Sequence, residues 1–216
     1  MTNNQPSGHG RIVFALDVDS VAAARRLVTV LEGRVGVFKI GLELFVKAGP
    51  AVIDTVRELS GAKIFLDLKL HDIPTTVRRT MRQIAELGVD FATVHCSGGA
   101  AMLAAAVAGS SGAVSVLGVT VLTSVKSDSG GATDLNELVL ERAGLAQEAG
   151  CAGVICSAWE VAAIKRRWGK AFLGITPGIR PPHYLAGKNE DQGRIITPGK
   201  AVVQGADFLV VGRPIR

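Results

Sequence analysis

Short apolar segments alternate with longer segments of helical periodicity along this chain. The apolar segments predict strands at Ile12–Asp17, Val35–Ile40, Ile64–Leu70, Phe91–His95, Val114–Leu122, Gly153–Ser157, Phe172–Thr176 and Phe208–Gly212. The segments between them predict helices at Ser20–Glu32, Glu43–Leu59, Thr75–Leu87, Gly99–Ala108, Asp134–Ala149, Ala158–Trp168 and Pro198–Gln204. Continuous apolar strands that alternate with helices indicate a parallel sheet covered on both faces.

Eight such strands fit a (β/α)8 TIM barrel better than an open doubly wound sheet. The expected fold class is therefore α/β, with one barrel domain over residues 1–216 and a disordered tail over residues 1–10. A barrel also needs a helix after its eighth strand, but this sequence stops at Arg216. The final C-terminal helix is thus expected to be missing from this chain, and either truncation or cover by a neighbouring subunit would explain it.

Residues at the ends of the predicted helices support this segmentation. Asp19 or Ser20 can cap the first helix, because a short polar side chain accepts a hydrogen bond from the first turn. Gly88 and Gly150 follow two later helices, where a left-handed backbone is needed. The chain therefore reads as a recurring strand–helix unit.

Composition narrows the class of partner. The chain has 48% hydrophobic and 20% charged residues, a net charge of +5 and a pI near 9.4. It has no basic stripe with an aromatic platform, so an anionic small molecule is a better partner than nucleic acid. No apolar segment is long enough to span a membrane, and no signal peptide is recognised. The three cysteines lack metal-ligand spacing, which favours reduced thiols and a cytoplasmic location.

Charged side chains gather at the end of the third predicted strand. Asp67 and Lys69 alternate with apolar residues and so project from one face, and Asp72 lies just past the strand end. Two carboxylates and an ammonium group are costly to crowd together unless each is paired. This cluster is therefore the leading candidate for catalysis, with a structural salt bridge as the alternative.

Further polar residues follow other strands, at the end of the barrel where active sites form. Asp17 follows the first strand, Lys39 the second and Thr123 the fifth. Arg180 follows the seventh strand and Arg213 the eighth. Each of the charged residues, taken alone, is also explained by a structural ion pair or a solvated loop.

A phosphate site is expected between the last two strands. The segments Thr176-Pro177-Gly178-Ile179-Arg180 and Val211-Gly212-Arg213-Pro214 offer glycine amides and cationic side chains, which bind phosphate in many barrels. Gln192, in a long polar loop, can reach the ligand if that loop closes as a lid. The sequence shows no metal-ligand spacing and no dinucleotide fingerprint.

Taken together, these motifs resemble the orotidine 5′-phosphate decarboxylases of the bacterial type, along nearly the whole chain. The resemblance rests on Ala15-Leu16-Asp17, Phe38-Lys39-Ile40-Gly41, Phe65-Leu66-Asp67-Leu68-Lys69-Leu70-His71-Asp72-Ile73-Pro74, Val119-Thr120-Val121-Leu122-Thr123-Ser124, and the two phosphate segments. It implies a lyase without metal or cofactor that converts orotidine 5′-phosphate to UMP. Lys69 would be the catalytic lysine, with Asp67 and Lys39 as its charged partners.

The resemblance also assigns the remaining site residues. It implies a homodimer in which Asp72, Ile73 and Thr76 enter the neighbouring subunit's site. Asp17 and Lys39 resemble the ribose ligands. Thr123 would contact the base. The phosphate would be bound by Arg180, Gln192, Gly212 and Arg213.

Three other functions are compatible with the sequence. A sugar-phosphate decarboxylase or hexulose-phosphate synthase would share the Asp-x-Lys-x-x-Asp pattern but depend on magnesium. A barrel that binds a phosphate ligand without turnover is the non-enzymatic alternative, and a nucleic-acid-binding module is the weakest.

Overall fold

The computed structural model describes residues 8–125, 135–184 and 194–216. Its strands are all parallel and form one closed barrel in chain order. They are β1 (Ile12–Ala15), β2 (Val37–Gly41), β3 (Lys63–Leu70), β4 (Phe91–His95), β5 (Ser115–Val119), β6 (Gly153–Ile155), β7 (Leu173–Thr176) and β8 (Phe208–Val211). The expected TIM barrel is confirmed.

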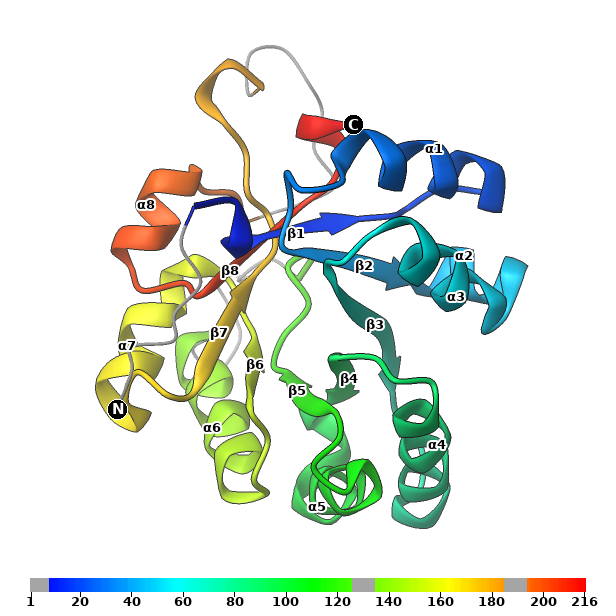
Figure 1. Ribbon diagram of the computed structural model, residues 1–216. Coiled ribbons are helices and arrows are strands. Elements are labelled where there is room, and N and C mark those ends of the chain that lie inside the picture. The colour runs from blue at the N-terminus through cyan, green and yellow to red at the C-terminus, as the bar shows by residue number, and fades with distance from the viewer. Residues whose placement is uncertain (1–7, 126–134, 185–193) are drawn as a thin grey trace.

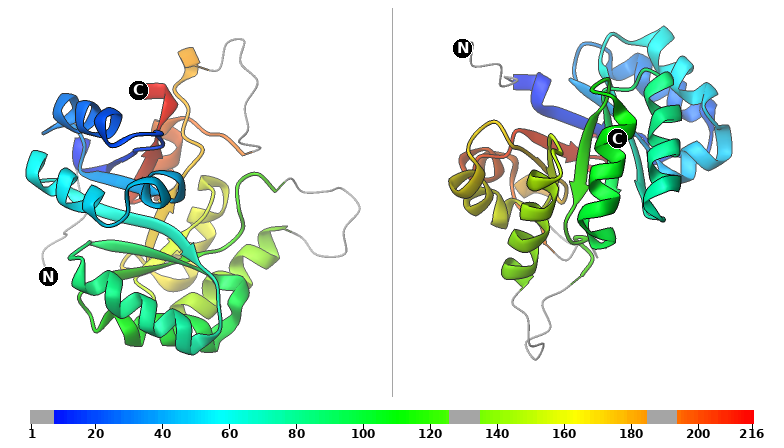
Figure 2. Two further views of the ribbon diagram at one scale, coloured as in Figure 1. Left: turned by 90° about the vertical axis from the view of Figure 1, so that its right-hand side faces the viewer. Right: turned by 90° about the horizontal axis from the view of Figure 1, so that it is seen from below.

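Helices form an outer layer around the strands (Figures 1 and 2). The α-helices are α1 (Val21–Leu31), α2 (Leu42–Ala48), α3 (Ala51–Leu59), α4 (Pro74–Glu86), α5 (Gly99–Ser110), α6 (Leu135–Glu148), α7 (Ala158–Trp168) and α8 (Pro198–Val203). Short 3-10 helices are η1 (Gly8–Arg11), η2 (Cys96–Gly98), η3 (Pro182–Tyr184) and η4 (Arg213–Ile215). Ser20 is the residue that caps α1, since its hydroxyl accepts from Ala23 N at 3.3 Å.

Alternation along the strands decides which side chains fill the barrel. Val13, Val37 and Phe65 belong to the cluster inside the barrel, whereas Phe14 and Phe38 pack outward against the helices. The next inward position on β2 is Lys39 and the next on β3 is Asp67. Two charged side chains therefore stand directly above an apolar plug, at the C-terminal end of the barrel.

The helix predicted over residues 43–59 is in fact two helices, so that expectation was wrong. Gly49 ends α2 with a φ of 62°, and Pro50 begins the next turn. A left-handed glycine followed by proline interrupts the helical hydrogen bonds, although the apolar periodicity continues through it. The fifth strand is also shorter than predicted and ends at Val119.

A short 3-10 helix lies at each end of the described chain. A disordered tail was predicted over residues 1–10; residues 8–10 instead belong to η1, and residues 1–7 lie outside the described residues. The described residues from Gly212 to Arg216 include η4 and contain no α-helix. The Arg216 guanidinium donates to the Asp17 main-chain oxygen at 2.9 Å, which joins this end to the loop after β1. The C-terminus accordingly lies beside α1 (Figure 1).

Candidate active site

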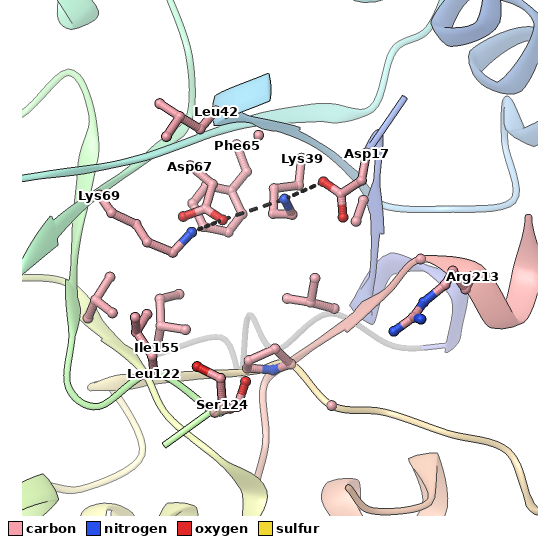
Figure 3. Close-up of a pocket in the computed structure, with 18 of the residues that line it drawn as sticks. Asp17, Lys39, Leu42, Phe65, Asp67, Lys69, Leu122, Ser124, Ile155 and Arg213 are labelled. Atoms are coloured by element: carbon pink, nitrogen blue, oxygen red, sulfur yellow. Dashed lines mark hydrogen bonds and ion pairs between the residues drawn. The ribbon is translucent and has the colours of Figure 1, made fainter. Parts of the chain in front are cut away.

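A cavity of about 580 Å³ opens at the C-terminal end of the barrel. Its wall is built from the ends of several strands and from the loops that follow them (Figure 3). The volume lies in the range of small-molecule sites. The predicted site residues that line it are Asp17, Lys39, Asp67, Lys69, Thr123, Arg180, Gly212 and Arg213.

Four of these residues form a chain of alternating charge. Lys39 Nζ lies 3.0 Å from Asp17 Oδ1 and 3.5 Å from Asp67 Oδ2. Asp67 Oδ2 also accepts from Lys69 Nζ at 2.8 Å. Lys39 and Asp67 are buried, with side chains 10% and 11% exposed, whereas the Lys69 side chain is 35% exposed. The outermost ammonium of the chain thus faces the cavity (Figure 3).

Asp67 stays ionised in spite of its burial. Burial by itself would raise the pKa of this carboxyl, but Lys39 and Lys69 outweigh it and lower the pKa below its ordinary value of 3.8. Thr93 Oγ1 adds a hydrogen bond to Asp67 Oδ1 at 3.0 Å. Thr93 was missed in the sequence, where the only signal was a polar residue in the middle of a buried strand.

Lys69 has an unusual backbone that aims its side chain. Its φ is 53°, in the left-handed region that residues other than glycine seldom occupy. The pairing of β3 with β4 shifts between Leu66 and Leu70, and Lys69 N donates to Thr93 Oγ1 at 2.9 Å instead of to the strand ladder. Such irregularities cluster at functional sites. The bulge allows the Lys69 ammonium to turn back onto Asp67.

Replacing Asp67 with asparagine is expected to lower the free energy of unfolding by roughly 3 kcal/mol at neutral pH, because Lys69 loses its carboxylate partner and buried Lys39 keeps only Asp17. The folded pKa of Asp67 lies below 3.8, so its contribution is fully present above that pH and is lost as the pH falls through the folded pKa. Urea unfolding of the wild type and of Asp67→Asn, at neutral pH and at a pH below 3.8, measures the difference in the free energy of unfolding.

Asp54→Asn is the matched control, since Asp54 pairs with Arg57 at 2.8 Å on the surface with its side chain 68% exposed. That variant should change stability by less than about 1 kcal/mol. A wild-type and Asp67→Asn difference that does not shrink in acid would contradict the assigned role of the Asp67 charge.

Two arginines, Arg180 and Arg213, also line the cavity. Arg213 follows β8 and lies across the cavity from Lys69 (Figure 3). Arg180 is 5% exposed, and its guanidinium lies 5.6 Å from the centre of the Tyr184 ring. Gly178, two residues before it, has a φ of 77°, and a residue with a side chain would be strained in that conformation. The two predicted phosphate segments are therefore brought together, while Gln192 lies outside the described residues.

Apolar side chains that line the cavity include Val121, Leu122 and Ile155. Thr123 is 9% exposed and lines the cavity beside Leu122 and Ser124. Gly41 lies close to the chain of charges on another side, since a Cβ there would be 3.0 Å from Asp17 Oδ1 and 3.1 Å from Lys39 Nζ. A side chain at this position would crowd the Asp17 carboxylate and the Lys39 ammonium. Leu42, Ser124 and Arg216 line the cavity as well and were not predicted.

Asp72, Ile73 and Thr76 do not reach this cavity within one chain. Asp72 Oδ1 accepts from Ile73 N at 2.7 Å, and the Ile73 side chain is 67% exposed. Asp72 and Thr76 line a separate hollow of about 290 Å³ beside β3, which Lys69 also borders. The expected grouping of Asp67, Lys69 and Asp72 is thus only partly formed by a single subunit.

The three buried cysteine thiols are poor nucleophiles. Burial raises the pKa of the Cys96, Cys151 and Cys156 thiols to about 12, and all three are free. Burial, followed by the charges of His71 and Lys69, lowers the pKa of His95. His95 does not line the cavity.

The carboxylates at the cavity are already engaged by lysines. Asp17 and Asp67 both pair with Lys39, and Asp67 pairs with Lys69 as well. A magnesium ion needs oxygen ligands that are free to coordinate it. Over residues 8–125, 135–184 and 194–216, no three His, Cys, Asp or Glu side chains are grouped to hold a metal.

Within the same ranges no helix has the length and apolar character of a membrane span.

Comparisons with known proteins agree on one family. The model of the "Orotidine 5'-phosphate decarboxylase / HUMPS family" matches residues 10–216. A Desulfosudis oleivorans protein named orotidine 5′-phosphate decarboxylase is 56% identical over 214 residues, which cover 95% of this chain and 86% of that protein. A protein of the same name from Syntrophotalea carbinolica is 44% identical over 217 residues, covering 95% and 87%.

Solved structures give the same result. The crystal structure of orotidine 5′-phosphate decarboxylase from Lactobacillus acidophilus matches with a TM-score of 0.78 at 37% identity and covers 94% of this chain and 90% of that one. The Pyrococcus horikoshii enzyme of that name matches with a TM-score of 0.72 at 25% identity, covering 94% and 89%.

Proposed function

Because the chain belongs to the orotidine 5′-phosphate decarboxylase / HUMPS family, we propose that it decarboxylates orotidine 5′-phosphate to UMP without a cofactor. This reaction is the last step of de novo pyrimidine biosynthesis and makes the protein a carbon–carbon lyase. The observation that carries the proposal is the Lys69 ammonium, held 2.8 Å from buried Asp67 and open to the cavity.

The chemistry requires a cation at the reacting carbon. Loss of CO2 breaks the bond between C6 and the carboxylate and leaves the electron pair on C6, in an orbital that no conjugation spreads. A fixed ammonium stabilises that charge and then transfers a proton to C6, which gives UMP and a neutral amine. Solvent protonates the amine for the next turnover. Lys69 supplies both functions from one position.

Asp67 holds the Lys69 ammonium in place for this step. Its carboxylate accepts a hydrogen bond from Lys69 Nζ at 2.8 Å, and such charge-assisted hydrogen bonds are stronger than neutral ones. A neutral lysine would act as a nucleophile and form a Schiff base. Lys39 then balances the remaining charge of Asp67 and holds the carboxylate in place.

The rest of the cavity is assigned to the substrate. Asp17 and Lys39 bind the ribose hydroxyls, and Thr123 contacts the pyrimidine. The phosphate binds across the cavity from Lys69, where its ligands are Arg180, Gln192, Gly212 and Arg213. The place of Arg213 across the cavity from Lys69 (Figure 3) supports this assignment, because phosphate binding then positions the base without contact with the reacting carbon.

A homodimer completes the site in this proposal. Asp72, Ile73 and Thr76 leave the cavity of their own subunit, and the exposed Ile73 side chain offers an apolar contact for a second copy. Asp72 then approaches Lys69 of the neighbouring subunit. The cytoplasmic location predicted from the three free, buried cysteines remains a prediction.

Mixing two inactive variants tests the shared site. Lys69→Ala and Asp72→Ala subunits should each be inactive alone, whereas their heterodimer holds one site with both wild-type residues. After dissociation and reassociation at equal amounts, about a quarter of wild-type activity is expected, since half of the dimers are mixed and half of their sites are intact. If the mixture stays inactive although mixed dimers form, Asp72 does not enter the neighbouring subunit's site.

The alternative within the family is a magnesium-dependent reaction on a sugar phosphate. The pairing of Asp17 and Asp67 with lysines disfavours it, because a metal would have to displace those ammonium groups. The experiment is a spectrophotometric assay with orotidine 5′-phosphate in excess EDTA. Full turnover in chelator supports the proposal. Activity only with added magnesium, or none with this nucleotide, would overturn it.

A further inference from the structure

A buried ion pair behind the cavity joins α7 to the segment that precedes α8. Glu160, in the first turn of α7, pairs with Arg194, and their side chains are 1% and 14% exposed. Among the described residues, the Glu160 oxygens have no hydrogen-bond partner, so Arg194 is the cation that neutralises them. Neither residue lines the cavity. The proposed reaction gives this pair no part.

Arg194 is linked through the backbone to the wall of the cavity. Two residues after it, Ile196 N donates to Gly178 O at 3.1 Å, and Arg180 N donates to Ile196 O at 2.9 Å. The Ile179 and Ile196 side chains are 0% and 7% exposed and belong to one apolar cluster. The position of Ile196 therefore sets the backbone from Gly178 to Arg180.

We propose that Glu160 is a positioning residue: through Arg194 and Ile196 it fixes the backbone that carries Arg180 into the cavity. The inference rests on the proposed function, in which Arg180 binds the phosphate of the substrate. A salt bridge on the surface would not hold the segment, because exposed pairs are weak and mobile. This pair is buried, and separating its two charges would leave each one uncompensated in the protein interior.

The loss of the Glu160 charge would act at a distance. Arg194 would remain as an unpaired cation in a site that excludes water, so its side chain would have to turn out to solvent. Ile196 lies two residues away and would shift with it, and the hydrogen bonds to Gly178 and Arg180 would weaken. Arg180 would then present its guanidinium to the phosphate less often.

A double-mutant cycle between Glu160→Gln and Arg180→Ala tests this route. Glu160→Gln alone is expected to lower kcat/KM for orotidine 5′-phosphate about tenfold, mostly through KM, as for residues that share a network. In the Arg180→Ala background the same change should have almost no effect. An equal fractional loss in both backgrounds, or no loss in either, would overturn the proposal.

Asp207→Asn is the matched control. Asp207 is 1% exposed and pairs with Lys165 of the same helix α7 at 2.5 Å, but this pair does not line the cavity and joins α7 to Phe172 and Gly174. The same carboxylate-to-amide change should lower Tm without changing kcat/KM. A loss of kcat/KM equal to that of Glu160→Gln would assign both pairs a structural role only.

Two additions keep the test decisive. If Glu160→Gln does not fold, the cycle is run with Arg194→Lys, which keeps a cation near Glu160 but loses the planar fork. If the wild-type protein does not turn over orotidine 5′-phosphate, the proposed function fails by itself. The cycle is then measured on the Kd of inorganic phosphate, and an effect of Glu160→Gln that does not depend on Arg180 overturns the positioning role.

Discussion

Replacing Lys69 with alanine is expected to reduce kcat on the order of 10⁵-fold while UMP still binds. One ammonium both stabilises the charge on C6 and supplies the proton. Electrostatic stabilisation by one group contributes about 10²- to 10³-fold and general acid catalysis about 10²- to 10⁴-fold, and here the two are lost together. The fall in orotidylate absorbance measures kcat, and calorimetry measures UMP binding.

Lys63→Ala is the control for this variant. Lys63 begins the strand that carries Lys69, but it lies at the opposite end of the barrel, where its Nζ is 5.7 Å from the centre of the Phe91 ring. Turnover should be unchanged there. Ordinary turnover by Lys69→Ala, with the fold intact by circular dichroism, would remove Lys69 from the reaction.

Replacing Arg213 with alanine is expected to lower kcat/KM by about 10²- to 10³-fold, because a charge-assisted hydrogen bond to the phosphate is lost and its binding energy no longer positions the base. Arg213 lines the cavity far from Lys69, so the chemistry of the reacting carbon is left untouched. The affinity for UMP should fall with it, whereas the affinity for uridine, which lacks the phosphate, should stay the same.

Arg166→Ala provides the comparison for a lost positive charge. Arg166 is exposed on the outer surface of α7, and it does not line the cavity. Its replacement should leave kcat/KM within about twofold of wild type, since exposed distant charges are screened. If Arg213→Ala weakens the binding of uridine and of UMP equally, Arg213 does not bind the phosphate.

The succession of strands and helices could be predicted because burial on both faces leaves a clear signal. Parallel strands of a barrel must be apolar almost throughout, so β1 to β8 stand out from the helices between them. The boundary at Gly49 and Pro50 was misjudged because the apolar face of α2 and α3 continues across it. There the backbone, not the hydrophobic pattern, decides where the helix stops.

The candidate site was predictable only where it lies on regular structure. Strand alternation places Lys39 and Asp67 above the apolar interior, and both do point there. The same argument was incomplete for Lys69, since the chain bulges between Leu66 and Leu70 and its φ is 53°. Thr93, which hydrogen-bonds to both Asp67 and Lys69, has no neighbour in sequence that would reveal its role.

By itself the sequence determined the (β/α)8 barrel, the end of it that holds the charged groups, and the identity of most of those groups. Only the tertiary structure decided which charged side chains form ion pairs. Lys39 pairs with both Asp17 and Asp67, and Glu160 pairs with Arg194. The physical reason is the range of the interactions. Hydrophobic alternation is local and is written into neighbouring residues, whereas an ion pair between distant strands exists only after the barrel has closed.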